Sequence, residues 1–102
     1  MPASTKVSLA PMTLDHLAAV LAVELESFPQ PWSREAFEFE LLHNKVAQYL
    51  VAMVDETVVG YAGIWVLVDE AHVTNIAVAA NWRRQGIGAA LLEGLIKIAA
   101  AS

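Results

Sequence analysis

Three apolar segments follow one another through the middle of the chain and constrain its fold more than any other feature. They are VAQYLVAMV at residues 46–54, TVVGYAGIWVLV at residues 57–68 and HVTNIAVA at residues 72–79. Short apolar runs between polar stretches are typical of buried strands. The connections at Asp55 and Asp69 are long enough only for hairpins, which predicts an antiparallel meander. Because the runs are almost continuously apolar, we expect helices on both faces of the sheet.

A strand and a helix are predicted ahead of this meander. The strand covers residues 6–9 and ends at Pro11, and Thr13 is placed to cap the helix that follows. Five apolar residues then recur at helical spacing, which predicts that they face the core. They are Leu14, Leu17, Ala18, Leu21 and Leu25.

Two further helices complete the predicted element order. The prolines in FPQPW, residues 28–32, end the first helix, and Ser33 caps a second in which Phe37 and Leu41 share a face. A last helix is expected over residues 86–101. Its apolar residues cover so much of its circumference that burial on most sides is predicted. They are Ile87, Leu91, Leu92, Leu95, Ile96, Ile98 and Ala99.

The chain is therefore predicted to be a single α/β (α+β) domain over residues 1–102, with a mixed sheet flanked by helices in the order β-α-α-β-β-β-α. The 102 residues allow one domain, and the 57% of hydrophobic residues exceeds the usual share, which indicates a covered surface or further chain. A net charge of −5 argues against nucleic-acid binding, and without cysteine there is no thiolate site. No run spans a bilayer and MPASTKVSLAPM resembles no signal peptide, so we expect a cytoplasmic protein without a membrane partner.

The turn NWRRQGIG at residues 81–88 has the residues of an anion site. A helix start presents unpaired N–H groups and a positive dipole end, and glycines let the backbone approach a ligand closely. Arg83 and Arg84 add forked donors. On the glycines alone, a plain turn with solvated arginines is an equally good interpretation. A dinucleotide fingerprint is excluded because Leu91 occupies the position of its third glycine.

With its surroundings, this turn resembles the GNAT superfamily of acetyl-CoA-dependent N-acetyltransferases. RRQGIG fits the [QR]-x-x-G-x-[GA] motif, with the strand NIAVA before it and an apolar helix after it. FPQPWSREAF, VDEA and NIAV make the chain most similar to the RimI group, which acetylates the N-terminal alanine of a ribosomal small-subunit protein. The element order matches the first part of that fold, which implies that C-terminal elements are missing.

The resemblance implies roles for individual residues. Residues that wrap the pyrophosphate of acetyl-CoA would be Arg84, Gln85, Gly86, Ile87, Gly88 and Ala89. Backbone groups for the pantetheine would come from Ile76, Ala77 and Val78, on a strand that in this family often carries a bulge. Trp32 is expected either to line the groove for the acceptor or to cap the core. The catalytic base and acid are expected beyond Ser102, so no residue of this chain is assigned to them.

Other candidates have stronger structural interpretations. Glu70, His72 and Tyr61 are possible proton-transfer groups, but a solvated turn and strand packing explain them better. The isolated His16 and His43 lack a second ligand at helical spacing, so no metal site is expected.

The predicted function is acetyl transfer from acetyl-CoA to a protein N-terminal amine, with a ribosomal protein N-terminus as the peptide partner. One alternative is a GNAT enzyme that acetylates a small-molecule amine. The other is a non-catalytic fragment that binds acetyl-CoA or serves in an interaction. We also expect weak or no activity from this chain alone, and self-association through an unpaired strand edge.

Overall fold

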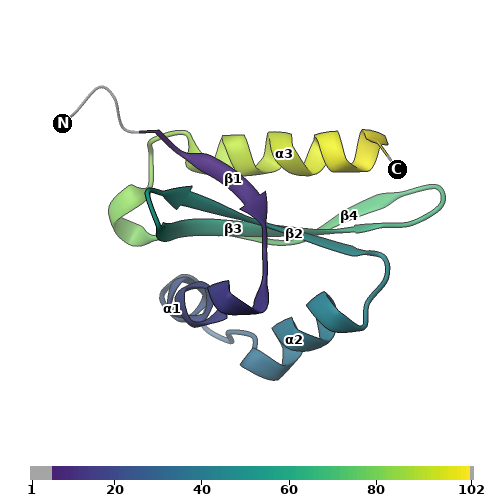
Figure 1. The fold of residues 1–102 in the computed structure, drawn as a ribbon, viewed down its shortest axis with the longest axis horizontal. Helices are drawn as coiled ribbons and strands as arrows, with labels where there is room; N and C mark the ends of the chain where they lie inside the picture. The colour runs from purple at the N-terminus through teal and green to yellow at the C-terminus, as the bar shows by residue number, and fades with distance from the viewer. Residues whose placement is uncertain (1–5, 102) are drawn as a thin grey trace.

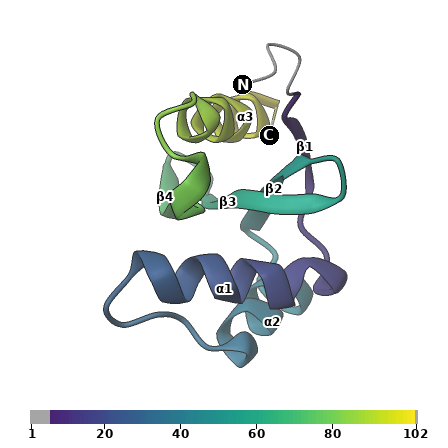
Figure 2. The ribbon, with the colours of Figure 1, turned by 90° about the vertical axis from the view of Figure 1, so that its left-hand side faces the viewer.

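A four-stranded antiparallel sheet lies between two helices on one face and a single helix on the other (Figures 1 and 2). The computed structural model describes residues 6–101; the first five residues of the segment in which no signal peptide is predicted, and the terminal Ser102, lie outside them. In chain order the elements are β1 (Ser8–Pro11), a 3₁₀ turn (Leu14–His16), α1 (Leu17–Ser27), α2 (Arg34–Leu42), β2 (Ala47–Val54), β3 (Thr57–Val66), β4 (Ala71–Val78), a 3₁₀ turn (Ala80–Trp82) and α3 (Ile87–Ala101). The predicted order and fold class are confirmed.

The meander forms as predicted, in the order β1-β2-β3-β4. A two-residue turn joins β2 to β3, and Asp55 at φ 56° provides the left-handed residue that such hairpins need. The first strand covers residues 8–11 instead of the predicted 6–9, so Pro11 is its last residue and does not interrupt it. Proline is tolerated there because β1 is an edge strand.

The predicted core face of the first helix is partly wrong. Leu14 lies in the 3₁₀ turn and Leu25 is 68% exposed, whereas the buried positions are Leu17, Val20, Val23 and Glu24. Almost every position of α1 is apolar, so the spacing alone cannot select one face. Contact with β3 and β4 makes that selection.

Burial of the last helix is also narrower than predicted. Ile87, Leu91 and Leu95 are buried against the sheet, but Leu92 is 42% exposed and Ile96 is 58% exposed. The sheet covers one side of α3, and no other element of the described chain lies on its outer side (Figure 1). In residues 6–101 there is no helix long and apolar enough to cross a membrane.

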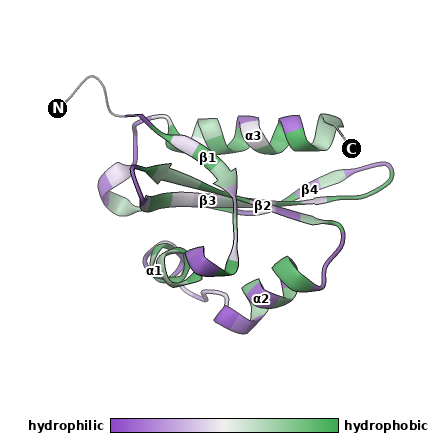
Figure 3. Cartoon of the chain, in the orientation of Figure 1, coloured by the Kyte–Doolittle hydropathy of each residue, from purple (hydrophilic) through white to green (hydrophobic). Residues whose placement is uncertain are grey.

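A hydrophobic core lies on each face of the sheet, and the hydrophilic residues gather in the turns and at the start of α2 (Figure 3). Beneath α1 and α2 the buried aromatic residues Phe37, Tyr49 and Tyr61 pack edge to face. Trp65 was expected in a buried strand pattern, but it is 36% exposed at the rim of this core.

The β3–β4 pairing contains a β-bulge at Thr74. Gly63 pairs with Asn75 and Ile64 pairs with Val73, so Thr74 has no residue opposite it. A bulge bends its strand and redirects the side chains beside it. The family resemblance implied such a bulge on this strand, and the register confirms it.

Candidate functional site

The turn between β4 and α3 folds its backbone into two left-handed residues. Arg84 has φ 64° and Gly86 has φ 82°, and α3 begins at Ile87 directly after them. A non-glycine residue in this region costs about 1–2 kcal/mol, and such conformations cluster at functional sites. Alternating right- and left-handed residues turn successive N–H groups toward one side, where an anion can bind. The first N–H groups of α3 have no partner within the helix and add to this set.

Gly86 and Gly88 serve the turn in different ways. A Cβ atom at Gly86 would meet no atom within 4 Å, so glycine is needed there for its φ rather than for space. A Cβ at Gly88 would lie 3.9 Å from Val78 Cγ2, an ordinary contact. Gly88 therefore tolerates a side chain sterically and leaves open the space in front of β4.

Arg83 holds the turn to its surroundings. Its Nε donates to the carbonyl oxygen of Val78 at 2.9 Å, and its Nη2 donates to Ser27 Oγ at 3.3 Å. The N–H of Ala80 donates to Glu26 Oε1 at 2.8 Å, which ties the same turn to the end of α1. Both arginines are exposed, but Arg83 makes hydrogen bonds within the protein, whereas Arg84 makes none among residues 6–101.

A cavity of about 420 Å³, named here the loop cavity, lies between the end of α1, β4 and the start of α3. Its lining residues are Ser27, Phe28, Ile76, Ala77, Val78, Arg83 and Gly88. The fold thus brings the predicted strand residues 76–78 next to Gly88 of the motif. The side chain of Ile87 is 2% exposed in the core, so only its backbone can face a ligand. Arg84, Gln85 and Ala89 are exposed near the cavity without lining it.

A second cavity of about 320 Å³, the Trp32 cavity, lies beside the first and shares Phe28 with it. It is lined by Glu24, Phe28, Pro29, Gln30, Trp32, Thr74 and Asn75. Trp32 is half-buried, and its ring centroid lies 5.2 Å from that of Phe37. The indole therefore both packs on the core and lines the cavity, so the two interpretations of Trp32 are compatible.

Glu24 is a buried carboxylate that the sequence analysis did not single out. It is 2% exposed, Tyr61 Oη donates to its Oε1, and the N–H of Trp32 donates to its Oε2 at 2.8 Å. These bonds satisfy the charge and attach the loop of residues 28–32 to α1 and β3. A glutamate four residues after Val20, on a face of apolar residues, was the signal available in the sequence.

Glu40 is a second buried carboxylate, and it accepts three hydrogen bonds. Tyr49 Oη donates at 2.8 Å, Trp65 Nε1 at 2.6 Å and Asn44 Nδ2 at 2.9 Å. Burial raises the pKa of Tyr49 well above its ordinary value, and the bond to Glu40 acts in the same direction. Tyr49 therefore keeps its proton as a donor over the whole physiological pH range.

The three candidates for proton transfer, Glu70, His72 and Tyr61, occupy different environments. His72 and Glu70 form an exposed pair with Nε2 and Oε2 2.5 Å apart, and His72 lines a shallow apolar hollow with Trp32 and Trp65. Tyr61 is fully buried and its hydroxyl is bonded to Glu24, so it does not face a substrate. Among residues 6–101, no group of three or more histidine, aspartate or glutamate side chains could hold a metal ion.

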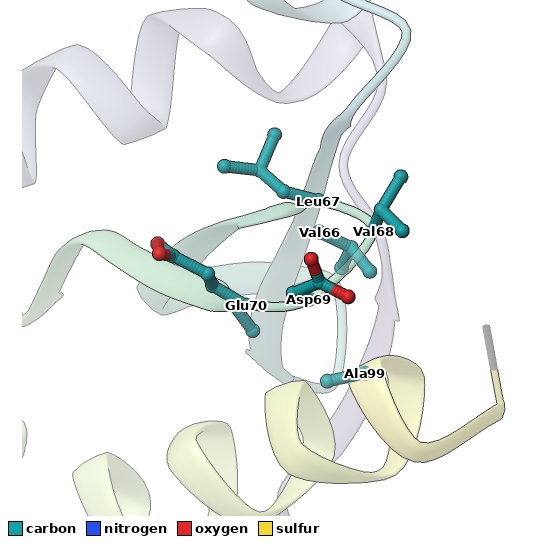
Figure 4. Close-up of a pocket in the computed structure, with 7 residues that line it drawn as sticks. Val66, Leu67, Val68, Asp69, Glu70 and Ala99 are labelled. Carbon is teal, nitrogen blue, oxygen red and sulfur yellow. The ribbon is translucent and has the colours of Figure 1, made fainter.

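A further hollow of about 540 Å³ lies at the other end of the sheet, between the β3–β4 hairpin and the end of α3. Figure 4 shows Leu67, Val68 and Asp69 around it, with Ala99 of α3 on its other side. None of the residues predicted to bind the cofactor lines it. The hollow is therefore separate from the site at the β4–α3 turn.

Comparison with known proteins identifies the family of the chain. Residues 17–102 match the acetyltransferase (GNAT) family model. The [ribosomal protein bS18]-alanine N-acetyltransferase of Escherichia coli (strain K12) is 32% identical over 91 residues, which cover 87% of this chain and 59% of that protein. A protein of Bacillus subtilis (strain 168), named provisionally for the same activity, is 37% identical over 94 residues, which cover 92% of this chain and 62% of that protein. The chain thus spans about three fifths of the length of these relatives.

Solved structures of other proteins have the same fold. The crystal structure of the ribosomal-protein-S18-alanine N-acetyltransferase from Escherichia coli has a TM-score of 0.81 at 28% identity, over 92% of this chain and 59% of that one. The PaiA N-acetyltransferase of Thermoplasma acidophilum, solved in complex with coenzyme A, shares the fold with a TM-score of 0.83 at 16% identity, over 94% and 73%. The motif at the β4–α3 turn, the bulged strand before it and these matches lead to one conclusion: the chain belongs to the acetyltransferase (GNAT) family.

Proposed function

We propose that this chain binds acetyl-CoA at the β4–α3 turn and forms part of an enzyme that acetylates the N-terminal amine of a protein. The observation that carries the proposal is the loop cavity, where the backbone of residues 76–78 lies beside Gly88 below a turn with two left-handed residues. Exposed backbone N–H groups at a helix start and the Arg84 guanidinium are suited to a pyrophosphate. The edge of β4 offers N–H and C=O groups to an extended amide chain.

The acceptor is proposed to be the N-terminal alanine of a ribosomal small-subunit protein. The names of the relatives that are 32–37% identical support this choice. The Trp32 cavity, which adjoins the loop cavity, is the proposed acceptor site. Acetyl-CoA supplies an activated acetyl group. The amine nitrogen forms a bond to the carbonyl carbon, the carbon–sulfur bond breaks, the nitrogen loses one proton and the released thiolate takes one up.

Cofactor binding is tested with the charge-reversing variant Arg84→Glu. We expect acetyl-CoA affinity to fall at least about tenfold, because a charge-assisted contact to phosphate is replaced by repulsion. Isothermal titration calorimetry measures this loss. The matched control is Arg34→Glu, which reverses another exposed charge, on α2, that is paired with Glu38 at 3.0 Å. Equal affinities for wild type and Arg84→Glu would refute the assigned role of Arg84.

Acceptor class is tested by following the indole signal of Trp32 by NMR with coenzyme A present. A peptide that begins with alanine should shift this signal, and the same peptide with an acetylated N-terminus should not. A shift caused by polyamines but not by the peptide would support the small-molecule alternative. Binding of neither amine nor acetyl-CoA would support the non-catalytic interaction fragment.

A further inference from the structure

The side chain of Tyr49 crosses one strand of the sheet to reach the bulge on the next. Tyr49 of β2 pairs with Gly63 of β3, and Gly63 pairs with Asn75 of β4, so the three residues form one row across the sheet. The hydroxyl of Tyr49 lies 3.0 Å from Thr74 Oγ1, at the residue that has no opposite partner. A contact over two strand spacings requires the aromatic ring to pass directly over β3.

Gly63 makes this crossing possible. A Cβ atom at Gly63 would lie 2.5 Å from Tyr49 Cζ and 2.6 Å from Thr74 Oγ1, closer than real Cβ atoms come to any atom. Tyr49 is held in place, since it is 5% exposed and belongs to the core. The absence of a side chain at Gly63 is therefore a requirement of the Tyr49–Thr74 contact.

Glu40 fixes the far end of the tyrosine. Its Oε1 accepts from Tyr49 Oη at 2.8 Å and from Trp65 Nε1 at 2.6 Å, and Glu40 is 7% exposed. Hydrogen bonds to a carboxylate are stronger than those between neutral groups. The hydroxyl of Tyr49 is thus held between a charged acceptor on α2 and Thr74 on β4.

The bulge is connected on its other side to the proposed ligand sites. Thr74 Oγ1 lies 2.8 Å from Asn75 Oδ1, and both residues line the Trp32 cavity. Asn75 Nδ2 is buried and has no hydrogen-bond partner among the described residues. The strand then continues directly into residues 76–78, which line the loop cavity. Movement of the bulge would therefore displace the strand that faces both cavities.

We infer that Glu40 and Tyr49 are positioning residues, which hold the Thr74 bulge through the gap at Gly63 and thereby place residues 76–78 for acetyl-CoA. The identity of the ligand rests on the proposed function. Neither Glu40 nor Tyr49 lines the loop cavity, so they act through Thr74 and the strand. If Glu40 and Tyr49 were purely structural, their substitution would lower the free energy of unfolding without weakening acetyl-CoA binding.

The test uses two variants that remove one hydroxyl each, Tyr49→Phe and Thr74→Val. Both keep the shape of the side chain, and each is expected to weaken acetyl-CoA binding by about two- to tenfold, as loss of one hydrogen bond does. The double variant should lose less than the sum of the two single losses, because the two changes share the Tyr49–Thr74 contact. Tyr61→Phe is the matched control, since it removes another buried tyrosine hydroxyl that is bonded to Glu24 instead.

The expected result is weaker binding in Tyr49→Phe and Thr74→Val, non-additivity in the double variant, and a smaller loss in Tyr61→Phe than in either single variant. Unchanged affinity in both single variants, or an equal loss in Tyr61→Phe, would overturn the inference.

Amide NMR spectra recorded without ligand separate the inference from the proposed function. The signals of Asn75 and residues 76–78 should shift in Tyr49→Phe, and the Asn75 signal should shift less in Tyr61→Phe, since Tyr61 pairs with Ala77 and not with Asn75. If the wild-type chain does not bind acetyl-CoA, the proposed function fails. These shifts then still decide whether Tyr49 holds the bulge, and their absence would refute it.

Discussion

At the scale of single residues, the two motif glycines are separable by physical role. Gly86 is needed for a left-handed φ of 82°, whereas Gly88 has a φ that other residues adopt and room for a Cβ. Because Gly88 lines the loop cavity, a methyl group there would occupy ligand space rather than protein space. The same substitution at the two positions should therefore have different consequences.

Gly88→Ala is expected to weaken acetyl-CoA binding about tenfold, while the free energy of unfolding changes by less than about 0.5 kcal/mol. Gly86→Ala is expected to lower the free energy of unfolding by about 1 kcal/mol through its backbone strain. Calorimetric titration and urea denaturation of both variants give the two quantities. A Gly88→Ala chain that binds like wild type would show that the ligand does not enter the loop cavity.

Tyr49 predicts a specific dependence of stability on pH. Its pKa in the folded protein is raised above the ordinary 10.0, so the unfolded chain releases this proton first. The contribution of the protonated Tyr49 to the free energy of unfolding is fully present below pH about 10. It falls as the pH rises further, by up to about 1.4 kcal/mol per pH unit. Comparison with Tyr49→Phe isolates the effect, because other titrating groups are common to both chains.

Denaturant titrations across the alkaline range measure this difference. The stability gap between wild type and Tyr49→Phe should be constant below pH about 9 and narrow above pH about 10. A gap that stays constant up to the alkaline limit would contradict a raised pKa at Tyr49.

At the scale of elements, the loop between α1 and α2 is held by buried polar contacts. The N–H of Trp32 donates to Glu24 on α1, and Ser33 Oγ caps α2 by accepting from the N–H of Ala36 at 3.1 Å. The predicted cap at Ser33 is thus confirmed. Since this loop supplies Phe28 and Trp32 to the cavities, its order depends on a carboxylate that lies outside it.

Glu24→Gln is expected to lower the free energy of unfolding by about 1–3 kcal/mol. The amide offers a single acceptor oxygen to two donors, Tyr61 Oη and the N–H of Trp32, so one buried donor loses its partner. Hydrogen exchange of the Trp32 amide should speed up in parallel. Glu38→Gln, at an exposed glutamate, is the control and should stay within about 0.5 kcal/mol of wild type. Equal stability of the two variants would rule out an anchoring role for Glu24.

At the scale of the whole molecule, the described chain is compact, but one long sheet edge is uncovered. The radius of gyration is 13.2 Å, as expected for a domain of about 100 residues. Of the two edge strands, β1 has four residues and ends in Pro11, whereas β4 has eight residues. Val73, on β4, is 46% exposed. An apolar edge of this length is a template for pairing with another chain.

Val73→Lys is therefore expected to reduce self-association of the chain, because a charge on an edge strand opposes pairing. Analytical ultracentrifugation over a range of concentrations measures the change. The control is Leu25→Lys, which places the same charge at an exposed position on α1, away from the sheet edge. Equal self-association of the two variants would show that β4 is not the contact.

The strands were predicted well and the buried faces of the helices less well, for a common reason. Each strand is an apolar run bounded by polar turn residues, so its limits are local and were placed within about two residues. In α1 and α3 nearly every residue is apolar, so local spacing leaves the inward face undefined. Leu25 and Ile96, which were predicted to face the core, are exposed because the neighbouring sheet contacts only the opposite side.

By itself, then, the sequence determined the element order, the hairpins and the glycine motif at the β4–α3 turn, because these depend on neighbouring residues. Only the tertiary structure decided which donors form hydrogen bonds to Glu24 and Glu40, and how Tyr49 reaches Thr74. Apart from the bond between Asn44 and Glu40, those hydrogen bonds join residues between 8 and 37 positions apart. Burial of a polar group is acceptable only when its partner is in place, and that partner is fixed by packing rather than by local chain preference.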